Sequence, residues 1–399
     1  MAGTVHDDTR VRAATRAVYV AFIGSGWAMS SWATRIPQVR DGLDLTPSRL
    51  GLVLLAIACG SIVALPLAGT IVTRFGSRLT ITAMAVVLCV SMTGIALGYH
   101  LGVVPVVISL FGFGFAQGAW DVAMNVQGAV VEQKIGRSIM SRFHAGFSVG
   151  TVAGALTGTA TLALDISVTA HLIFFGLVIA ACVIAAVRGF VPDTDPVSAA
   201  DPAAGPKPSV LAAWIEPRTL LVGLFVLAFA FAEGTGVDWI AVAVIDDYGA
   251  AVTSGTLTYA IFLAAMTVGR WFGPGLLDRY GRVPVVRVLA LIALAGLALF
   301  VFGTALPIAV AGALLWGLGT SLGFPVGMSA ASDDPARAAA RVSVVASVGY
   351  CAFLGGPPLI GFLGDHITVQ KGLIAVAALL AVSLMVASVI RPLDPTRKN

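Results

Sequence analysis

The sequence predicts an all-α membrane protein in which twelve transmembrane helices form two pseudo-symmetric six-helix bundles. Three observations lead to this prediction. Of the 399 residues, 58% are hydrophobic and only 11% are charged, whereas about a quarter of the residues in soluble proteins are charged. Twelve apolar stretches are long enough to cross a bilayer. The two halves of the chain also resemble each other at one fixed spacing.

Each predicted helix is an apolar stretch of roughly 20 residues, which is the length that spans the hydrocarbon core. Helices are expected because a chain in lipid must satisfy its own backbone hydrogen bonds. In chain order, the predicted spans are residues 17–36, 49–71, 79–99, 103–131, 140–163, 169–188, 218–240, 255–276, 285–304, 307–330, 341–363 and 369–390.

The longest predicted loop, residues 189–217, divides the spans six and six. It is rich in proline, alanine and aspartate, a composition typical of a flexible linker. We therefore predict an N-terminal bundle over residues 1–188 and a C-terminal bundle over residues 218–399, joined by a cytoplasmic linker.

The two halves repeat each other at a shift of 205 residues. The segment "SLFGFGFAQG" (109–118) aligns with "LLWGLGTSLG" (314–323), and "TRFGSR" (73–78) aligns with "DRYGRV" (278–283). Since two separate segments agree on one shift, the six-helix unit is inferred to be duplicated. Such duplication is typical of secondary transporters, whose substrate sites lie at the repeat interface.

The basic residues indicate the orientation of the chain. Nineteen of the 24 Lys and Arg residues lie at or beyond helix ends that share one side. Cytoplasmic loops carry the excess of Lys and Arg, so both termini are expected in the cytoplasm of a multi-pass inner-membrane protein. The exceptions are Arg35, Arg40, Arg49 and Lys371 on the outer side, and Arg270 within a span.

The loops after the second and eighth spans read "GTIVTRFGSRLTI" and "GPGLLDRYGRVPVVR". They resemble the signature loop of the major facilitator superfamily, a Gly followed by Asp-Arg-x-Gly-Arg. Within that superfamily, "GFGFAQGAWDVAMN" and "SVGYCAFLGGPPLIGFLGD" resemble the fourth and eleventh helices of fucose:proton symporters and their relatives. The resemblance implies the superfamily's fold and a secondary transporter that works by alternating access. We expect it to be a monomer.

In the superfamily this loop is thought to hold the cytoplasmic side closed, its acid facing a helix start in the opposite half. The resemblance therefore implies a cytoplasmic gate, to which we add Glu132 and Arg142 at the adjoining ends of the fourth and fifth spans. Thr73 replaces the acid of the first loop, and Pro274 replaces the leading Gly of the second. Alternatively, the loops only turn the chain and set its orientation. The matching residues are Gly69, Arg74, Gly76, Arg78, Asp278, Arg279, Gly281 and Arg282.

Gln117, Asp121 and Asn125 share one face of the fourth span at a spacing of four residues. A charged side chain inside the membrane is costly, so Asp121 should face a cavity or a partner. A desolvated carboxyl can take up and release a proton near neutral pH, and the resembling symporters use this acid for proton coupling. We predict that Asp121 couples protons and that Gln117 and Asn125 bind substrate. Alternatively, Asp121 is tied to an arginine or a helix end.

The seventh span carries Glu233, which the same argument makes the second proton-coupling candidate. Asp238 lies near the outer end of that span, and Arg35 lies at a similar depth on the first span. We predict that these two pair as a periplasmic gate when the outer side is closed. Arg270 on the eighth span could bind an anionic substrate, but pairing with Asp278 or snorkelling to the cytoplasmic face is favoured.

Two tryptophans are candidates for substrate binding. Trp27 on the first span and Trp239 on the seventh could stack against a sugar or an aromatic solute. Tryptophans near helix ends are more often anchors at the membrane interface, which is the alternative for both.

The sequence lacks the patterns of several other functions. It has no GxxxxGK[ST] phosphate loop, no HExxH motif and no Cys/His metal cluster. We therefore predict that the protein is not an enzyme and has no cofactor or metal, and the net charge of +4 does not suggest nucleic acid. The predicted function is proton-coupled symport of a small polar solute, a sugar or metabolite. The alternatives are a proton-driven exporter and a non-transporting sensor or scaffold, and a Na⁺ gradient is not excluded.

Overall fold

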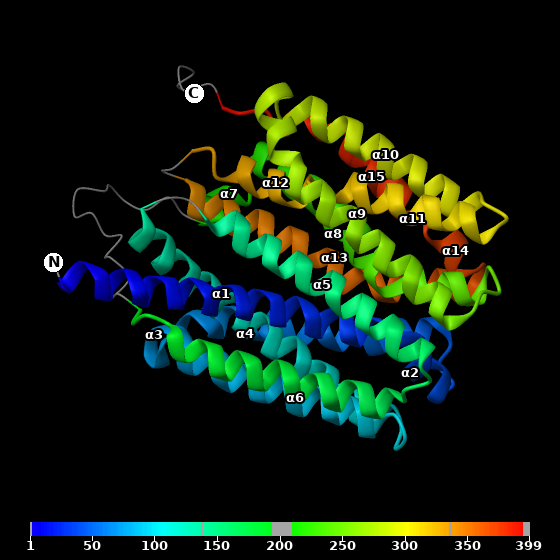
Figure 1. The fold of residues 1–399 in the computed structure, drawn as a ribbon. Helices are drawn as coiled ribbons and strands as arrows, with labels where there is room; N and C mark the ends of the chain where they lie inside the picture. Colours follow the sequence, from blue (N-terminus) through cyan, green and yellow to red (C-terminus); the bar gives the residue numbers. More distant parts are fainter. Residues whose placement is uncertain (1, 137–138, 194–209, 335–336, 394–399) are drawn as a thin grey trace. The chain divides into compact units, whose positions relative to one another are not determined.

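The computed structural model describes residues 2–136, 139–193, 210–334 and 337–393, and these ranges contain helices and no strand (Figure 1). Contacts divide the chain into two units. Residues 1–45 and 52–201 form the first unit, and residues 46–51 and 202–399 form the second. The predicted bundle boundaries stay predictions, and residues 194–209 of the predicted linker lie outside the described residues.

The first half of the chain folds into six α-helices and one short 3-10 helix. A residue with non-helical backbone angles, Gly76, interrupts the longest of them and separates the predicted spans 49–71 and 79–99. The elements are α1 (Ala2–Ala33), α2 (Ile36–Gly42), α3 (Pro47–Gly98), α4 (Val103–Ile135), α5 (Met140–Ala163), α6 (Val168–Ala186) and η1 (Val187–Gly189).

The second half of the chain contains nine α-helices and one 3-10 helix in the described residues. The predicted span 307–330 is divided in two by a break at Ser321 and Leu322. The elements are α7 (Val210–Ala213), α8 (Pro217–Asp246), α9 (Val252–Tyr280), α10 (Arg282–Phe302), α11 (Leu306–Thr320), α12 (Gly323–Ala331), α13 (Ala338–His366), α14 (Val369–Gly372), α15 (Ile374–Val386) and η2 (Ala387–Ile390).

Nine helical stretches of the described chain are long and apolar enough to cross a membrane, the 52-residue α3 among them. The helix α1 overlaps the predicted span 17–36, and α5 coincides with the predicted span 140–163. Neither helix reaches that apolarity, and the two pack against each other. The protein is therefore a multi-pass membrane protein, and twelve as the number of spans stays a prediction.

The two signature loops adopt the same backbone conformation. Gly76 has φ 79° and ψ 156°, and Gly281, at a shift of 205 residues, has φ 83° and ψ 164°. A positive φ of this kind is strained for residues with a Cβ atom, which explains a glycine at both positions. The structure thus supports the duplication that was inferred from the sequence.

Candidate functional site

Asp121 lies half-buried on α4 and has one side-chain partner, Asn125. The Asn125 Nδ2 donates to the Asp121 backbone oxygen at 2.8 Å and to Asp121 Oδ1 at 3.3 Å. No Lys, Arg or His of the described chain lies within ion-pair distance of this carboxyl, and no helix N-terminus donates to it. The alternative, an acid tied to an arginine or a helix end, is therefore not what the structure shows.

Gln117, one turn before Asp121, is bonded to α1. Ser25 Oγ donates to Gln117 Oε1 at 3.1 Å, and Gln117 Nε2 donates to the Ser25 backbone oxygen at 3.0 Å. Both ends of this amide are thus used within the first unit. A solute could bind Gln117 only by replacing these bonds or by using the remaining donor and lone pairs.

The two candidate tryptophans differ in access. Trp27 is half-buried, and its Nε1 donates to Thr157 Oγ1 at 3.1 Å while its ring lies 5.7 Å from that of Phe175. Trp239 is fully buried, and its indole N–H has no acceptor among the described residues. An enclosed ring cannot stack against a solute unless its neighbours move, so Trp27 is the better placed of the two.

Glu233 on α8 forms an ion pair with Arg270 on α9. Arg270 Nη2 donates to Glu233 Oε1 at 2.8 Å and to Oε2 at 2.7 Å, and Arg270 Nε donates to the Ser321 backbone oxygen at 3.3 Å. The expected partner of Arg270, Asp278, is exposed and forms no ion pair with it. The expected pairing with Asp278 was wrong because α8 packs against α9 and brings Glu233 to the guanidinium.

Arg35, a predicted periplasmic gate residue, is fully buried in its own unit. It donates to four acceptors, none of them acidic: Gln38 Oε1 at 2.5 Å, His171 Nδ1 at 2.5 Å, Thr161 Oγ1 at 2.9 Å and the Ile166 backbone oxygen at 3.1 Å. These bonds join the α1–α2 junction to the ends of α5 and α6. Four of the five donors of Arg35 are therefore already used.

Asp238, the other predicted periplasmic gate residue, is half-buried on α8. Within the described ranges it has no hydrogen-bond donor or cation as a partner. Arg35 and Asp238 belong to different units, so their pairing stays a prediction.

Two carboxylates of the first unit bind helix N-termini, one at the start of α5 and one beside the Gly76 break in α3. Glu132 Oε2 accepts from the backbone nitrogens of Ile139 and Met140 at 2.7 Å each, at the start of α5. Asp193 Oδ2 accepts from the Ser77 nitrogen, directly after the Gly76 break in α3. Both arrangements are favourable because a helix N-terminus attracts negative charge.

Asp193 also binds α4, a role that the sequence did not reveal. Its Oδ1 accepts from Gln127 Nε2 at 2.7 Å, and the same nitrogen donates to the Val191 backbone oxygen at 2.9 Å. The first signature loop has Thr73 where the family has an acid, and Asp193 provides a carboxylate near that loop. Arg74, Arg78 and Arg142 are exposed, and their gate role stays a prediction.

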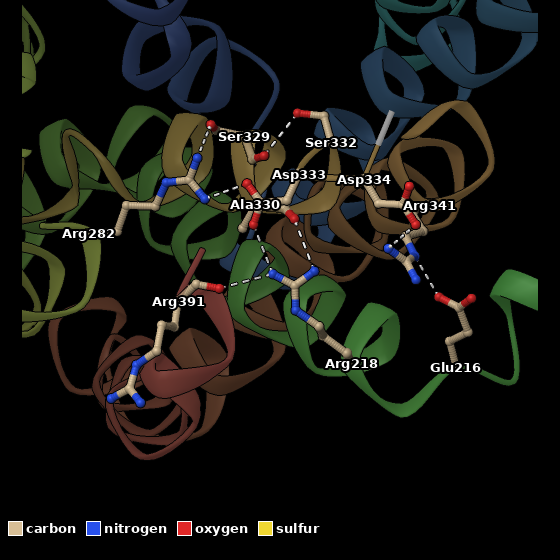
Figure 2. A network of polar contacts seen from close by, with 10 residues as sticks. All are labelled: Glu216, Arg218, Arg282, Ser329, Ala330, Ser332, Asp333, Asp334, Arg341 and Arg391. Atoms are coloured by element: carbon tan, nitrogen blue, oxygen red, sulfur yellow. Dashed lines mark hydrogen bonds and ion pairs between the residues drawn. The ribbon is translucent and has the colours of Figure 1, made fainter. Parts of the chain in front are cut away.

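Arginine–carboxylate pairs join the starts of α8, α10 and α13 in the second unit (Figure 2). Arg282 of the signature loop donates to Asp333 Oδ1 at 2.7 Å, and Arg218 donates to Asp333 Oδ2 at 3.0 Å. Arg341 donates to Glu216 at 2.7 Å. This hydrogen bond, the largest of several contributions, lowers the pKa of Glu216 below its ordinary value.

The sequence predicted Arg282 as a gate residue, but it did not predict the partner of Arg282, which is Asp333. Asp333 lies in the short segment between α12 and α13, about 50 residues further on, and nothing in its local sequence distinguishes it from a solvated loop acid. Asp278, Arg279 and Gly281 are exposed, and the opposing helix that Asp278 would face belongs to the other unit. Their part in a gate stays a prediction.

Comparison with known proteins assigns the chain to a family. The family model of the Major Facilitator Superfamily matches residues 18–355 and 240–399. The transporter y4wD of Sinorhizobium fredii is 31% identical over 94% of this chain and 98% of its own length. An MFS-type transporter of Yersinia pestis is 30% identical over 90% of this chain and 91% of its own length.

Solved transporter structures share the fold. The nucleoside transporter NupG has a TM-score of 0.72 at 12% identity, over 96% of this chain and 98% of that one. The D-xylose-proton symporter has a TM-score of 0.71 at 14% identity, over 95% and 97%. A variant of the Escherichia coli fucose:proton symporter FucP has a TM-score of 0.61 at 15% identity, over 94% and 97%. At these identities the likeness shows the fold alone.

Proposed function

This chain belongs to the Major Facilitator Superfamily, and on that premise we propose that it is a proton-coupled symporter of a small polar solute. Its relatives are transporters and not enzymes, so the protein is a secondary transporter of a membrane. The proposal adds the coupling ion, the direction and the solute class.

The observation that carries the proposal is the surroundings of Asp121. A coupling carboxyl must exist both ionised and protonated during each cycle. An arginine beside it would favour the ionised form, but Asp121 has only the amide of Asn125 as a side-chain partner. An amide both donates and accepts hydrogen bonds, so it can serve either form of the carboxyl.

The polar groups near Asp121 support a small polar solute. Gln117 and Asn125 carry amides on the same face of α4, and Trp27 lies on α1, which packs against α4. Structural neighbours are named for nucleoside, fucose and D-xylose transport. A sugar or a similarly hydroxylated metabolite fits this chemistry.

The remaining parts of the transport mechanism are proposed by analogy with the superfamily. Alternating access would use two six-helix bundles, with both termini in the cytoplasm and the signature loops at the cytoplasmic gate. Asp121 takes a proton from the outer side together with the solute and releases it inside. Glu233 is the second proton-coupling residue.

The experiment begins with a thermal-shift screen of sugars and metabolites at two pH values, because a bound ligand raises apparent stability. A ligand found in this way is then tested in proteoliposomes under an imposed inward proton gradient. We expect accumulation that a protonophore abolishes. Accumulation driven only by an outward proton gradient would indicate an exporter. If neither ligand binding nor flux is found, the protein is a sensor or scaffold.

A further inference from the structure

We propose that Arg270 binds the carboxylate of an anionic solute, which replaces Glu233 on the guanidinium when Glu233 takes up a proton. This inference rests on the proposed transport function. Of the sugars and metabolites considered there, it selects small polar metabolites that carry a carboxylate. It is carried by the geometry of the ion pair and by the backbone that surrounds it.

The pair leaves part of the guanidinium unused. Both oxygens of Glu233 lie on one nitrogen of Arg270, Nη2, and Nε donates to the Ser321 backbone oxygen. Nη1 has no acceptor among the described residues. A guanidinium has five N–H donors in a planar fork that matches a carboxylate through two parallel bonds. Since Glu233 does not use that fork, a second carboxylate can approach Arg270 through Nη1.

The backbone beside the pair is irregular. Ser321 lies between the end of α11 at Thr320 and the start of α12 at Gly323. Its own backbone angles stay helical (φ −55°, ψ −38°), and the departure is at Leu322 (φ −107°, ψ −9°). Within a membrane, non-helical backbone is tolerated where it is buried in protein or lines a water-filled cavity. Broken helices of this kind form the substrate and ion sites of many transporters. The bond from Arg270 to the Ser321 oxygen therefore places the guanidinium beside the junction of α11 and α12.

The pair is also accessible. The side chains of Glu233 and Arg270 each keep 26% of their surface exposed. Partial exposure allows a proton and a small anion to reach the two side chains.

No other charged group competes for Glu233. Among the described residues, Arg270 is the one cation within ion-pair distance of it. The remaining titratable side chains on α8 and on the helices packed against it form no ion pair with Glu233. They are Arg218, Asp238 and Asp246 on α8, Tyr259, Asp278, Arg279 and Tyr280 on α9, Arg341, Tyr350, Cys351, Asp365 and His366 on α13, and Lys371 on α14.

The exchange keeps the site balanced in charge. When Glu233 is ionised, it neutralises the charge of Arg270, so a second anion is not attracted to the site. When Glu233 is protonated, Arg270 is left as a partly buried and unpaired cation, which is unfavourable. A solute carboxylate then restores the balance. One proton and one anion therefore enter the site together, without a change in its net charge.

Chemical rescue with formate tests the proposal on the purified full-length protein. Glu233→Ala removes the resident carboxylate and leaves room for a small anion. We expect formate, but not formamide, to raise the thermal stability of this variant. The matched control is Asp238→Ala, which truncates an acid of the same helix that has no cation partner and should show no formate-specific gain. In Glu233→Ala/Arg270→Gln, the apparent affinity for formate should fall at least about tenfold.

Glu233→Gln provides a second route if the alanine variant does not fold. It keeps the side-chain volume and removes the charge, so formate should again stabilise it more than it stabilises the wild-type protein at neutral pH. Equal formate responses with and without Arg270, or no response in either Glu233 variant, would overturn the anion site. These measurements need neither a gradient nor a transported solute. A negative result would contradict the anion site but not the proposed transport function. Formate rescue in a protein that shows no solute flux would contradict the transport function but support the anion site.

Discussion

The intramembrane carboxylates of the two units, Asp121 and Glu233, have partners of different kinds. Asp121 receives a hydrogen bond from the neutral amide of Asn125 on its own helix. Glu233 receives two hydrogen bonds from the cation Arg270 on a neighbouring helix. The difference shows that the chemistry of an acid in a membrane helix depends on its partner, which is an amide of the same helix for Asp121 and a cation of a neighbouring helix for Glu233. A proton can leave or reach Asp121 without breaking an ion pair, whereas at Glu233 it cannot.

The same contrast appears beside the two signature loops. In the first unit, Asp193 binds a backbone N–H of α3 and the amide of Gln127. In the second unit, Asp333 binds the guanidinium groups of Arg218 and Arg282. In the second unit, Glu233 and Asp333 therefore both form ion pairs. In the first unit, Asp121 and Asp193 both accept hydrogen bonds from neutral donors.

The largest expected effect is the loss of the cation in the second unit. Arg270→Gln leaves Glu233 partly buried without a counter-ion, which should destabilise the protein by on the order of 3 kcal/mol. Glu233→Gln in the same chain should recover part of that loss, because the charge left unpaired is then removed. The measurement is denaturant unfolding of the purified protein in detergent. The matched control is Arg279→Gln, an exposed arginine of the same helix, expected to change stability by no more than about 0.5 kcal/mol. If Arg270→Gln and Arg279→Gln reduced stability equally, the ion pair between Arg270 and Glu233 would not be what distinguishes the second unit from the first.

A smaller effect is expected at the ion pair between Glu216 and Arg341 of the second unit. The hydrogen bond from Arg341 lowers the pKa of Glu216, so Glu216 stabilises the folded state above its ordinary pKa. That stabilisation is lost as the pH falls through the lowered pKa of the folded state. Glu216→Gln should therefore reduce stability at neutral pH by about 1 kcal/mol or less, and the difference from the wild-type protein should disappear in acid.

The control for this pH dependence is Asp278→Asn, which changes an exposed acid that has no ion pair in the described chain. Its stability should equal that of the wild-type protein both at neutral pH and in acid. Thermal unfolding across the acid range measures both variants. A Glu216→Gln difference that persists below the lowered pKa would mean that the residue acts through packing rather than through its charge.

The sequence was sufficient to predict that the chain is helical and which polar residues share one face of α4. Apolar length gave the helical ranges, and the shift of 205 residues anticipated the shared conformation of Gly76 and Gly281. A spacing of four residues was enough to place Asn125 beside Asp121. Each of these features depends on residues that are close in sequence or on the period of a helix.

The partners that come from other elements could not be predicted. Periodicity gives the face and depth of a residue but not the helix that packs on it. Arg270 was therefore assigned to Asp278 of its own helix instead of Glu233. Asp333 and Asp193, which bind the starts of the helices after the two signature loops, looked like ordinary loop acids. The acceptors that Arg35 uses on α5 and α6 were likewise not predicted.

The central claim, that Asp121 is the coupling carboxyl, is tested most directly in proteoliposomes that contain Asp121→Asn and a solute found in the thermal-shift screen. The asparagine keeps the hydrogen bond to Asn125 but cannot ionise. We predict that solute exchange at zero gradient is retained, while accumulation driven by an imposed pH gradient falls to that of liposomes without protein. Gradient-driven accumulation at the wild-type level would contradict the account.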